Sequence, residues 1–371
     1  MRTVLLTGAD GFIGRNLRTR LERRDDIRLI CIDVGNSKEE LTSAAIEADF
    51  VIHLAGVNRP KDISEFESGN KGLTEDLFDL LSSREKKVPI LISSSIQAAL
   101  DNPYGKSKLG AEEAIRDYAQ LTGASVFIFR LPNVFGKWCR PNYNSVIATW
   151  CNNTTHNLPI QINDPAAELH LVYIDDVAEA FISALDGKVC PENDGFCRVN
   201  QTYKRNLTEI AGMLESFSAS RKTLIIPSLD DRFTRALYAT WLSYLPEQEF
   251  SYSLEMKRDD RGWLAEFIKS PSFGQIFVSK TKPGITRGNH WHHTKVEKFL
   301  VISGEALIQF RKIGDKNILE YPVSGDELRV VDIPVGYTHS ITNIGNTELI
   351  TLFWADEIFN SAAPDTCFLG V

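Results

Sequence analysis

The chain has 371 residues, of which 43% are hydrophobic and 24% are charged, and its formal net charge is -8. These values are typical of a globular protein with two domains, because single cores stop growing at roughly 250 residues. No apolar run approaches the roughly 20 residues of a membrane span, and the acidic charge argues against a nucleic-acid partner. The six cysteines form no CxxC pair, which favours free thiols and a cytoplasmic location.

The first predicted strand, residues 3–7, runs into a glycine-rich turn that precedes a helical stretch. This order is typical of a dinucleotide-binding fold, because the glycines let the backbone approach a pyrophosphate and the helix supplies free N–H groups. The cofactor-binding residues expected in the turn and at the helix start are Gly8, Gly11, Phe12, Ile13, Gly14 and Arg15.

An acidic residue, Asp33, follows the second predicted strand. A carboxylate at this place commonly accepts a hydrogen bond from the ribose 2'-hydroxyl of NAD, and it would repel the additional phosphate of NADP. Arg15 and Lys38 are the nearby cations that would offset this repulsion. Taken alone, these residues favour NADH over NADPH.

The next two predicted strands end in small or polar residues. One ends at Leu54 and Ala55, beside the expected nicotinamide, and the other ends in the serines of 93–95, where open α/β sheets bind ligands. The following helix carries Tyr104 and Lys108. Residues four apart lie on one helical face, so the ammonium can lower the pKa of the phenol, and a serine opposite completes a proton relay to a carbonyl.

A second chemical motif lies in the C-terminal third, which changes at about residue 259 to short β segments. The motif consists of three imidazoles and one carboxylate. Three of these groups lie between two glycines that mark the ends of strands, and the fourth lies in a later segment. Such a set can surround one divalent ion. These residues are His290, His292, Glu297 and His339. The alternative is that they are ordinary residues of a β-barrel.

Residues 1–245 resemble the extended short-chain dehydrogenases, which act on nucleotide sugars. The resemblance is carried by TGADGFIG, HLAG, the serine triplet, YGKSK, RLPNVFGKW and LVYIDDVAEA. It implies that Tyr104 is the catalytic acid or base, that Lys108 is its partner and also contacts the cofactor, and that Ser95, or next Ser94, binds the carbonyl. It also implies an α/β Rossmann-type, doubly wound parallel sheet.

The same resemblance implies a site for the sugar nucleotide. Asn133 would contact the diphosphate, and Lys137 and Arg140 would add to that grip, although a solvated surface loop is an equal alternative for these two. The 4,6-dehydratases of the family carry an Asp-Glu pair where this chain has Ile96 and Gln97. This difference argues against dehydration and favours carbonyl reduction.

Residues 246–371 resemble the cupins, small antiparallel β-barrels that hold a metal, and within them the sugar-nucleotide epimerase branch. The motifs are GITRGNHWHHTKVEKFLVISG, PVGYTHSITN and DDRGWLAEF. The resemblance implies that the three histidines and Glu297 are the metal ligands. It also implies an acid-base pair that exchanges a proton beside a ketone, with His292, His293 and Tyr337 as candidates.

The whole chain resembles the bifunctional capsular and O-antigen polysaccharide enzymes of the UDP-N-acetyl-L-fucosamine pathway, through DNPYGKSKLG, FGKWCRPNYNSVIAT and KPGITRGNHWHHTK. This resemblance implies epimerisation at carbon 3 of a UDP-2-acetamido-2,6-dideoxy-4-hexulose, followed by reduction at carbon 4 to UDP-2-acetamido-2,6-dideoxy-L-talose. It also implies NADPH, Zn²⁺ and a homodimer. The alternatives are a single 4-reductase or 4-epimerase with a structural, dimerising barrel, and a barrel that regulates the first domain.

Overall fold

The computed structural model describes residues 1–58, 62 and 66–371. The chain divides into two compact units, which are described separately: unit 1 consists of 1–214 and 235–245, and unit 2 consists of 215–234 and 246–371. None of the helices in the described part of the chain combines the length and the apolar character of a membrane span.

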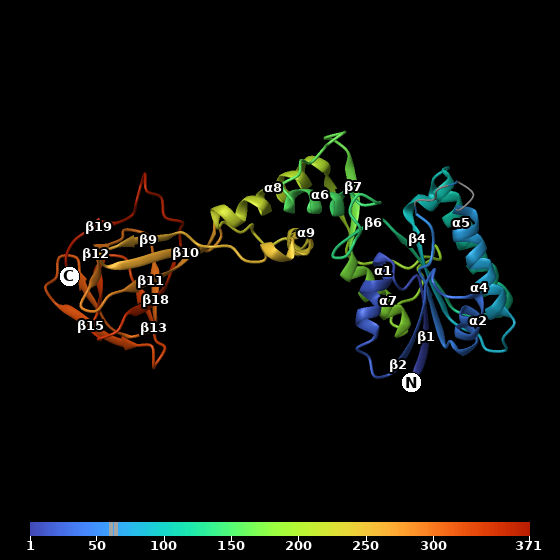
Figure 1. Ribbon diagram of the computed structural model, residues 1–371, viewed down its shortest axis with the longest axis horizontal. Coiled ribbons are helices and arrows are strands. Elements are labelled where there is room, and N and C mark those ends of the chain that lie inside the picture. The colour runs from blue at the N-terminus through green and yellow to red at the C-terminus, as the bar shows by residue number, and fades with distance from the viewer. Residues whose placement is uncertain (59–61, 63–65) are drawn as a thin grey trace. The chain divides into compact units, whose positions relative to one another are not determined.

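Unit 1 is built on a parallel sheet with the strand order β2-β1-β3-β4-β5 (Figure 1). Its strands are β1 (Arg2–Thr7), β2 (Ile27–Ile32), β3 (Phe50–His53), β4 (Ile90–Ser95) and β5 (Val126–Leu131). The chain runs from β1 to one side and then returns to the other side of β1, so the strand order reverses between β1 and β3. Ligands bind outside the carboxyl ends of the strands at such a point.

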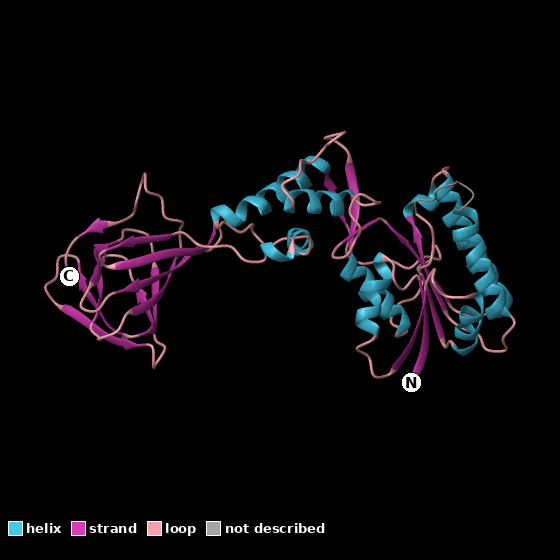
Figure 2. Ribbon diagram, viewed as in Figure 1, coloured by secondary structure: helices cyan, strands magenta, loops and turns pink. Residues whose placement is uncertain are grey.

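Helices cover both faces of this sheet (Figure 2). They are α1 (Phe12–Leu21), α2 (Lys38–Glu47), α4 (Leu73–Ser82), α5 (Pro103–Thr122) and α7 (Ile174–Leu185). Successive side chains of a strand point to opposite faces of the sheet, so alternate residues contribute to two hydrophobic cores, one on each face. Leu6 packs with α1 and α7 residues, whereas Leu5 packs with residues of α2, α4 and α5. The doubly wound fold predicted from the sequence is therefore confirmed.

Three further strands, three helices and three short helical turns precede the barrel strands, and the parts of them within 215–234 and after 245 belong to unit 2. The strands form a small sheet in the order β6-β7-β8. The elements are β6 (Asn133–Phe135), β7 (Glu168–Tyr173), β8 (Tyr203–Asn206), α6 (Val146–Thr155), α8 (Leu207–Thr223), α9 (Arg232–Leu242), η1 (Glu67–Gly72), η2 (Ile96–Ala99) and η3 (Glu247–Glu249).

Unit 2 contains two antiparallel sheets that enclose an apolar core, which confirms the predicted all-β barrel. One sheet has the order β16-β13-β18-β11-β10-β9 and the other β15-β14-β17-β12-β19. The strands are β9 (Met256–Asp259), β10 (Gly262–Ser270), β11 (Gly274–Thr281), β12 (Thr286–Trp291), β13 (Glu297–Ser303), β14 (Glu305–Lys312), β15 (Ile318–Ser324), β16 (Val330–Ile333), β17 (Tyr337–Asn343), β18 (Leu349–Ala355) and β19 (Cys367–Phe368). Inward-facing residues of both sheets, such as Phe299, Ile308 and Phe353, fill the interior.

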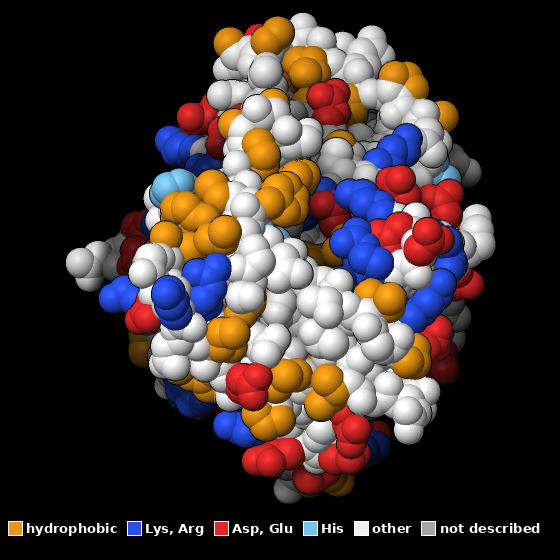
Figure 3. All heavy atoms as spheres, turned by 90° about the vertical axis from the view of Figure 1, so that its left-hand side faces the viewer, with side chains coloured by type: hydrophobic (Ala, Val, Ile, Leu, Met, Phe, Trp, Pro, Cys, Tyr) orange, Lys and Arg blue, Asp and Glu red, His pale blue; other side chains and the backbone are white. Residues whose placement is uncertain are grey.

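The surface of the barrel carries apolar side chains beside lysines and arginines, around a hollow (Figure 3). The edge strand β15 contributes exposed apolar residues, since Ile318, Leu319 and Tyr321 are 44%, 40% and 41% exposed. An edge strand that is apolar and unpaired on one side is a ready surface for association with another chain.

Candidate active site

The glycine turn of unit 1 brings the start of α1 against the carboxyl end of β3. Gly8 has φ +69°, and a Cβ atom there would lie 2.6 Å from the backbone nitrogen of Ala55. A Cβ atom on Gly14 would lie 2.0 Å from the carbonyl oxygen of Gly8. Only glycine fits either place. Gly11 is the N-cap residue of α1 and offers no side chain to the first turn, so the helix N-terminus can bind an anion.

The predicted ribose-binding carboxylate is already engaged with this turn. Asp33 Oδ2 accepts a hydrogen bond from the backbone N–H of Asp10 at 2.8 Å, and Oδ1 accepts one from the N–H of Val34 at 2.8 Å. Arg15 is exposed on α1. Arg18, one turn further, forms an ion pair with Asp10 at 3.5 Å. A cation that the sequence analysis did not single out therefore lies beside the residues expected to hold the adenosine ribose.

The proton-relay residues predicted from the sequence come together at the ends of β4 and α5. Tyr104 lies beside the Ser95 hydroxyl, and burial raises the pKa of Tyr104 while its interaction with Ser95 opposes the rise. Lys108 Nζ lies 5.9 Å from the centre of the Tyr104 ring and donates to the carbonyl oxygen of Ser93 at 3.4 Å. Burial lowers the pKa of Lys108 to about 8. The ammonium is therefore still charged at neutral pH and lies beside the Tyr104 ring.

Ser94 does not share this arrangement. Its hydroxyl donates to Glu112 Oε1 at 2.5 Å, on the face of β4 that packs against α5. Ile92, two residues earlier on the same face, belongs to the core beneath α5. Because strand residues alternate between faces, Ser95 points to the crevice when Ser94 points to the helix. Of the two serines, Ser95 is the one beside Tyr104.

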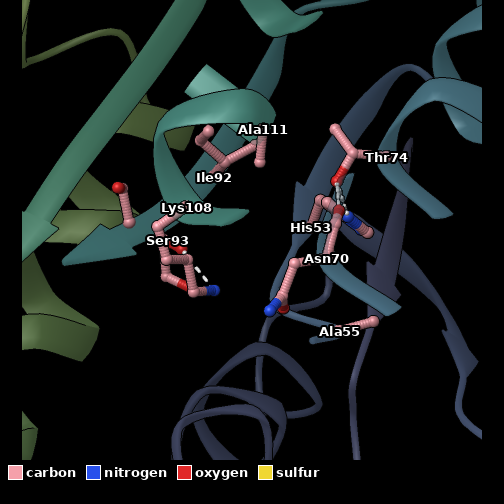
Figure 4. Close-up of a pocket in the computed structure, with 9 residues that line it drawn as sticks. His53, Ala55, Asn70, Thr74, Ile92, Ser93, Lys108 and Ala111 are labelled. Atoms are coloured by element: carbon pink, nitrogen blue, oxygen red, sulfur yellow. Dashed lines mark hydrogen bonds between the residues drawn. The ribbon is translucent and has the colours of Figure 1, made fainter. Parts of the chain in front are cut away.

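A small polar cavity lies directly behind Lys108 (Figure 4). Lys108 and Asn70 point toward one another across it, and His53 lies beyond Asn70. Asn70 donates to Ser107 Oγ at 3.0 Å and to the carbonyl oxygen of Val57 at 3.0 Å, which fixes η1 against α5. No sequence motif gave Asn70 a role.

The predicted sugar-nucleotide residues are spread over a loop and have different partners. Asn133 is exposed and donates to the carbonyl oxygen of His170 at 3.1 Å. Lys137 is paired with both oxygens of Asp175, at 2.8 and 2.9 Å. Arg140 is exposed and lies over the ring of Tyr143. The structure therefore leaves Arg140 open to an anion, whereas Lys137 would have to leave Asp175 to bind one.

The barrel brings the four predicted metal ligands into one cluster. Each offers one ligand atom, and these atoms all lie within 4.8 Å of one another. His290 pairs with His339 across β12 and β17, immediately after a register shift at Gly288. Their ring centres are 4.6 Å apart. The shift arises at Asn289, which has φ +58°.

The chemistry of this cluster fits a divalent cation. His339 is fully buried, and neither of its ring nitrogens has a hydrogen-bond partner among the described residues. A buried imidazole without a partner is costly unless an ion takes the lone pair. Burial alone would raise the pKa of Glu297, but the close approach of the His292 and His339 rings and the charge of Lys295 hold it below its usual range. Three imidazoles and one ionised carboxylate are a typical zinc donor set.

The C-terminal segment supports this cluster from outside. His292 Nδ1 is 2.5 Å from the backbone carbonyl oxygen of Asp365, to which it donates, so Nε2 is left toward Glu297 at 3.2 Å. The Asp365 carboxylate accepts hydrogen bonds from the backbone N–H groups of His293, Thr294 and Lys295. A hydrogen bond to the second nitrogen fixes the tautomer of a ligating histidine. The sequence analysis did not identify Asp365, because no spacing links it to the histidines.

Of the three proton-carrier candidates, His293 is exposed beside Trp291, and the other two differ in their freedom. His292 is 1% exposed and both of its nitrogens face a partner. Tyr337 lies on β17 two residues before His339, so the two side chains share the inner face of the barrel. Tyr337 packs at the margin of the apolar core and is only partly buried.

Comparisons with known proteins follow the same division. Residues 4–193 match the NAD dependent epimerase/dehydratase family, and residues 257–367 match the polysaccharide biosynthesis C-terminal domain. A UDP-2-acetamido-2,6-beta-L-arabino-hexul-4-ose reductase of Pseudomonas aeruginosa is 44% identical over 369 residues, which is 99% of both chains. The crystal structure of the capsular polysaccharide assembling protein CapF of Staphylococcus aureus is 50% identical and superposes with a TM-score of 0.94 over 99% of this chain and 100% of that one.

The chain belongs to the CapF-type family. A more distant structure, UDP-glucuronic acid 4-epimerase of Bacillus cereus with NAD, is 18% identical and has a TM-score of 0.54 over 65% of this chain and 96% of that one. That likeness shows the fold of the nucleotide-binding part alone. The family membership predicted from the sequence motifs is thus confirmed.

Proposed function

We propose that this chain is a bifunctional UDP-sugar enzyme, in which unit 1 reduces a 4-keto group with NADPH and the barrel epimerises carbon 3 of the same sugar. The substrate would be a UDP-2-acetamido-2,6-dideoxy-4-hexulose and the product UDP-2-acetamido-2,6-dideoxy-L-talose, a precursor of UDP-N-acetyl-L-fucosamine in capsule or O-antigen. The observation that carries the proposal is that one chain holds two separate sites, a tyrosine–serine–lysine relay and a histidine–carboxylate cluster.

In the reductase step the side chains of unit 1 would transfer one proton to the ketone oxygen. NADPH, when bound, supplies the hydride for carbon 4. Ser95 would hold the ketone oxygen and Tyr104 would donate its phenolic proton to it. Lys108 carries its charge below pH 8 and stabilises the phenolate that remains. Residues 96 and 97, where the dehydratases of the family carry an Asp-Glu pair, are Ile and Gln in this chain. Their lack of a carboxylate agrees with reduction rather than loss of water.

NADPH is the proposed cofactor, and NADH is the alternative that Asp33 favours. Both oxygens of Asp33 accept backbone N–H groups, so the carboxylate faces the glycine turn. Arg15 is exposed on the adjoining turn of α1 and could meet a phosphate on the ribose, whereas Arg18 would first have to leave Asp10 and Glu22. Steady-state kinetics with the two cofactors would decide, and a lower KM for NADH would favour the alternative.

In the epimerase step the barrel residues would hold an ion and move one proton. His290, His292, Glu297 and His339 would bind Zn²⁺. The ion, when bound, supplies the positive charge that makes the protons beside a ketone acidic. Tyr337 is the better-placed proton carrier, because both nitrogens of His292 are occupied by Asp365 and Glu297.

A second function rests on the number of ligands. Four protein ligands are typical of a closed, structural zinc site. With such a site the barrel would stabilise a homodimer, for which the exposed apolar residues of β15 offer a surface, and unit 1 would be a 4-reductase or 4-epimerase by itself. The homodimer is also part of the bifunctional proposal.

Deuterium incorporation separates these two functions. The protein is incubated with the UDP-4-keto sugar in heavy water without nicotinamide, and deuterium at carbon 3 is read by NMR. Incorporation that disappears in His339→Ala supports the epimerase. Reduction with NADPH but no incorporation without it would leave the barrel a structural role.

A further inference from the structure

A buried carboxylate lies behind the reductase relay. Glu112, on α5, is fully buried. Its Oε1 accepts hydrogen bonds from Ser94 Oγ at 2.5 Å and from Arg130 Nε at 2.8 Å, and its Oε2 accepts one from Arg130 Nη2 at 2.7 Å. This is a bidentate pair of the strongest kind, with one additional hydroxyl donor.

These three residues join the elements that carry the relay. Glu112 lies one helical turn after Lys108 on the same helix, and Ser94 immediately precedes Ser95 on β4. Ser94 and Arg130 are direct neighbours in the register of β4 and β5. The carboxylate therefore ties α5 to both strands at the end of the sheet where Ser95 meets Tyr104.

Packing alone does not explain a charged pair at this place. Replacing a buried ion pair by apolar residues is often neutral or stabilising, whereas the loss of one partner is strongly destabilising. An apolar pair would hold α5 against the sheet, but it would not orient a hydroxyl next to Ser95. Arg130 in turn stacks over Phe196, with its guanidinium 4.1 Å from the ring centre, so the pair has a single geometry.

The same carboxylate acts on Lys108 through space. Burial lowers the pKa of Lys108 to about 8, and the charge of Glu112 opposes this fall. The other titratable groups facing Lys108 are Tyr104, on its own helix, and His53, on β3. Burial lowers the pKa of His53 to about 3, so it stays neutral. The other described residues around the cavity carry no charge.

We propose that Glu112 is a positioning residue of the reductase site, which locks the strand end carrying Ser95 to the helix carrying Tyr104 and Lys108. It touches neither substrate nor cofactor and acts through Ser94 and Lys108. Its negative charge also favours the ammonium form of Lys108. The inference rests on the proposed reductase function, in which these three residues are the proton relay.

The test is the pH dependence of the reduction catalysed by the full-length Glu112→Gln variant, with the UDP-4-keto sugar and NADPH. The amide keeps the size of the side chain and one acceptor for Ser94, but it removes the charge. We expect kcat to fall about tenfold with KM for NADPH within about twofold, since relay geometry and not cofactor binding is disturbed. The alkaline limb of the kcat profile should move to lower pH by about one unit, because Lys108 loses its proton more readily.

The matched control is Glu113→Gln, which removes the same charge from the next position of α5, where the side chain is exposed. It should leave kcat and the pH profile as in the parent protein. An equal shift of the alkaline limb in both variants would overturn the role of Glu112, because any charge near α5 would then suffice.

A double variant separates positioning from stability. Glu112→Gln leaves the charge of Arg130 unpaired, whereas Glu112→Gln combined with Arg130→Met removes both charges and should restore the unfolding midpoint. A double variant that recovers stability but keeps the shifted alkaline limb supports the proposal. A double variant that recovers the parent pH profile as well would reduce Glu112 to a counter-ion of Arg130.

The proposed function is checked in the same assay with Tyr104→Phe. Loss of reduction in this variant upholds the relay, and the Glu112 variants then decide the positioning role alone. Full reduction in Tyr104→Phe would overturn the relay and the role of Glu112 with it.

Discussion

The two candidate sites of this chain are assembled in opposite ways. In unit 1 the crevice is lined by short continuous segments, namely the glycine turn of Gly8–Gly14 and the helix that carries both Tyr104 and Lys108. In the barrel every functional group is a side chain, contributed from β12 and the residue that directly follows it, from β13 and from β17, and one of them is held by a C-terminal residue. A site built within one helix tolerates changes elsewhere, whereas a site built across strands depends on the whole barrel.

The difference predicts that the two activities are separable, most clearly in Tyr104→Phe. This change should lower the rate of ketone reduction by about 10²- to 10⁴-fold, because the proton donor is lost. Deuterium exchange at carbon 3, measured by NMR without nicotinamide, should stay at the parent rate. A parallel loss of exchange would show that the two sites do not work independently.

The reverse separation is expected for His339→Ala. The variant should lose bound zinc, measured by elemental analysis, and lose exchange at carbon 3, because it removes a fully buried ligand. It should also lower the unfolding temperature of the barrel by several degrees, at about 4–8 °C per kcal/mol. The control is His156→Ala, an exposed histidine of unit 1. Full zinc content in His339→Ala would contradict the metal site.

Asp365→Asn tests whether the barrel site depends on a residue that is distant from it in sequence. The backbone carbonyl that holds His292 is retained, but the charge that binds three backbone N–H groups is lost. We expect zinc affinity to fall about 10- to 100-fold in competition with a chelator, as for other residues that support metal ligands. Asp315→Asn is the control, since this carboxylate also accepts backbone N–H groups, but in the turn between β14 and β15. Equal losses of zinc affinity in the two variants would show that the effect is not specific to Asp365.

The smallest expected effect distinguishes two neighbouring serines. Ser95→Ala should lower kcat for reduction about tenfold or more, because Ser95 is the hydroxyl beside Tyr104. Ser94→Ala removes only a donor to Glu112, and its loss of kcat should be several times smaller. The opposite order of the two effects would move the carbonyl-binding role to Ser94.

Much of unit 1 could be predicted from sequence because its signals are local. The glycines of the first turn and the four-residue spacing of Tyr104 and Lys108 each act within one element. The alternation of side chains along β4 could also have distinguished the two serines. Ile92 is a core residue, so Ser94, two positions later, points to the same face of the sheet, and Ser95 points to the other face. That signal favours Ser95 without any structure.

Other features could not be predicted, because their partners are distant in sequence. Lys137 is neutralised by Asp175, and Glu112 by Arg130, and no spacing rule connects either pair. The histidine–carboxylate cluster was predictable as a set because His290 and His292 are one residue apart and Glu297 follows five residues later. Asp365 was not, since an aspartate near the end of a chain is most often solvated.

The support of His292 by Asp365 bears on how the barrel folds. The two residues are 73 positions apart, so their contact closes a long loop, and we expect it to form late in assembly. Until β19 has paired with β12, His292 lacks the bond that fixes its tautomer. Tight zinc uptake should therefore coincide with the final folding step of the barrel, and the rate of zinc uptake in refolding protein would report when that step is complete.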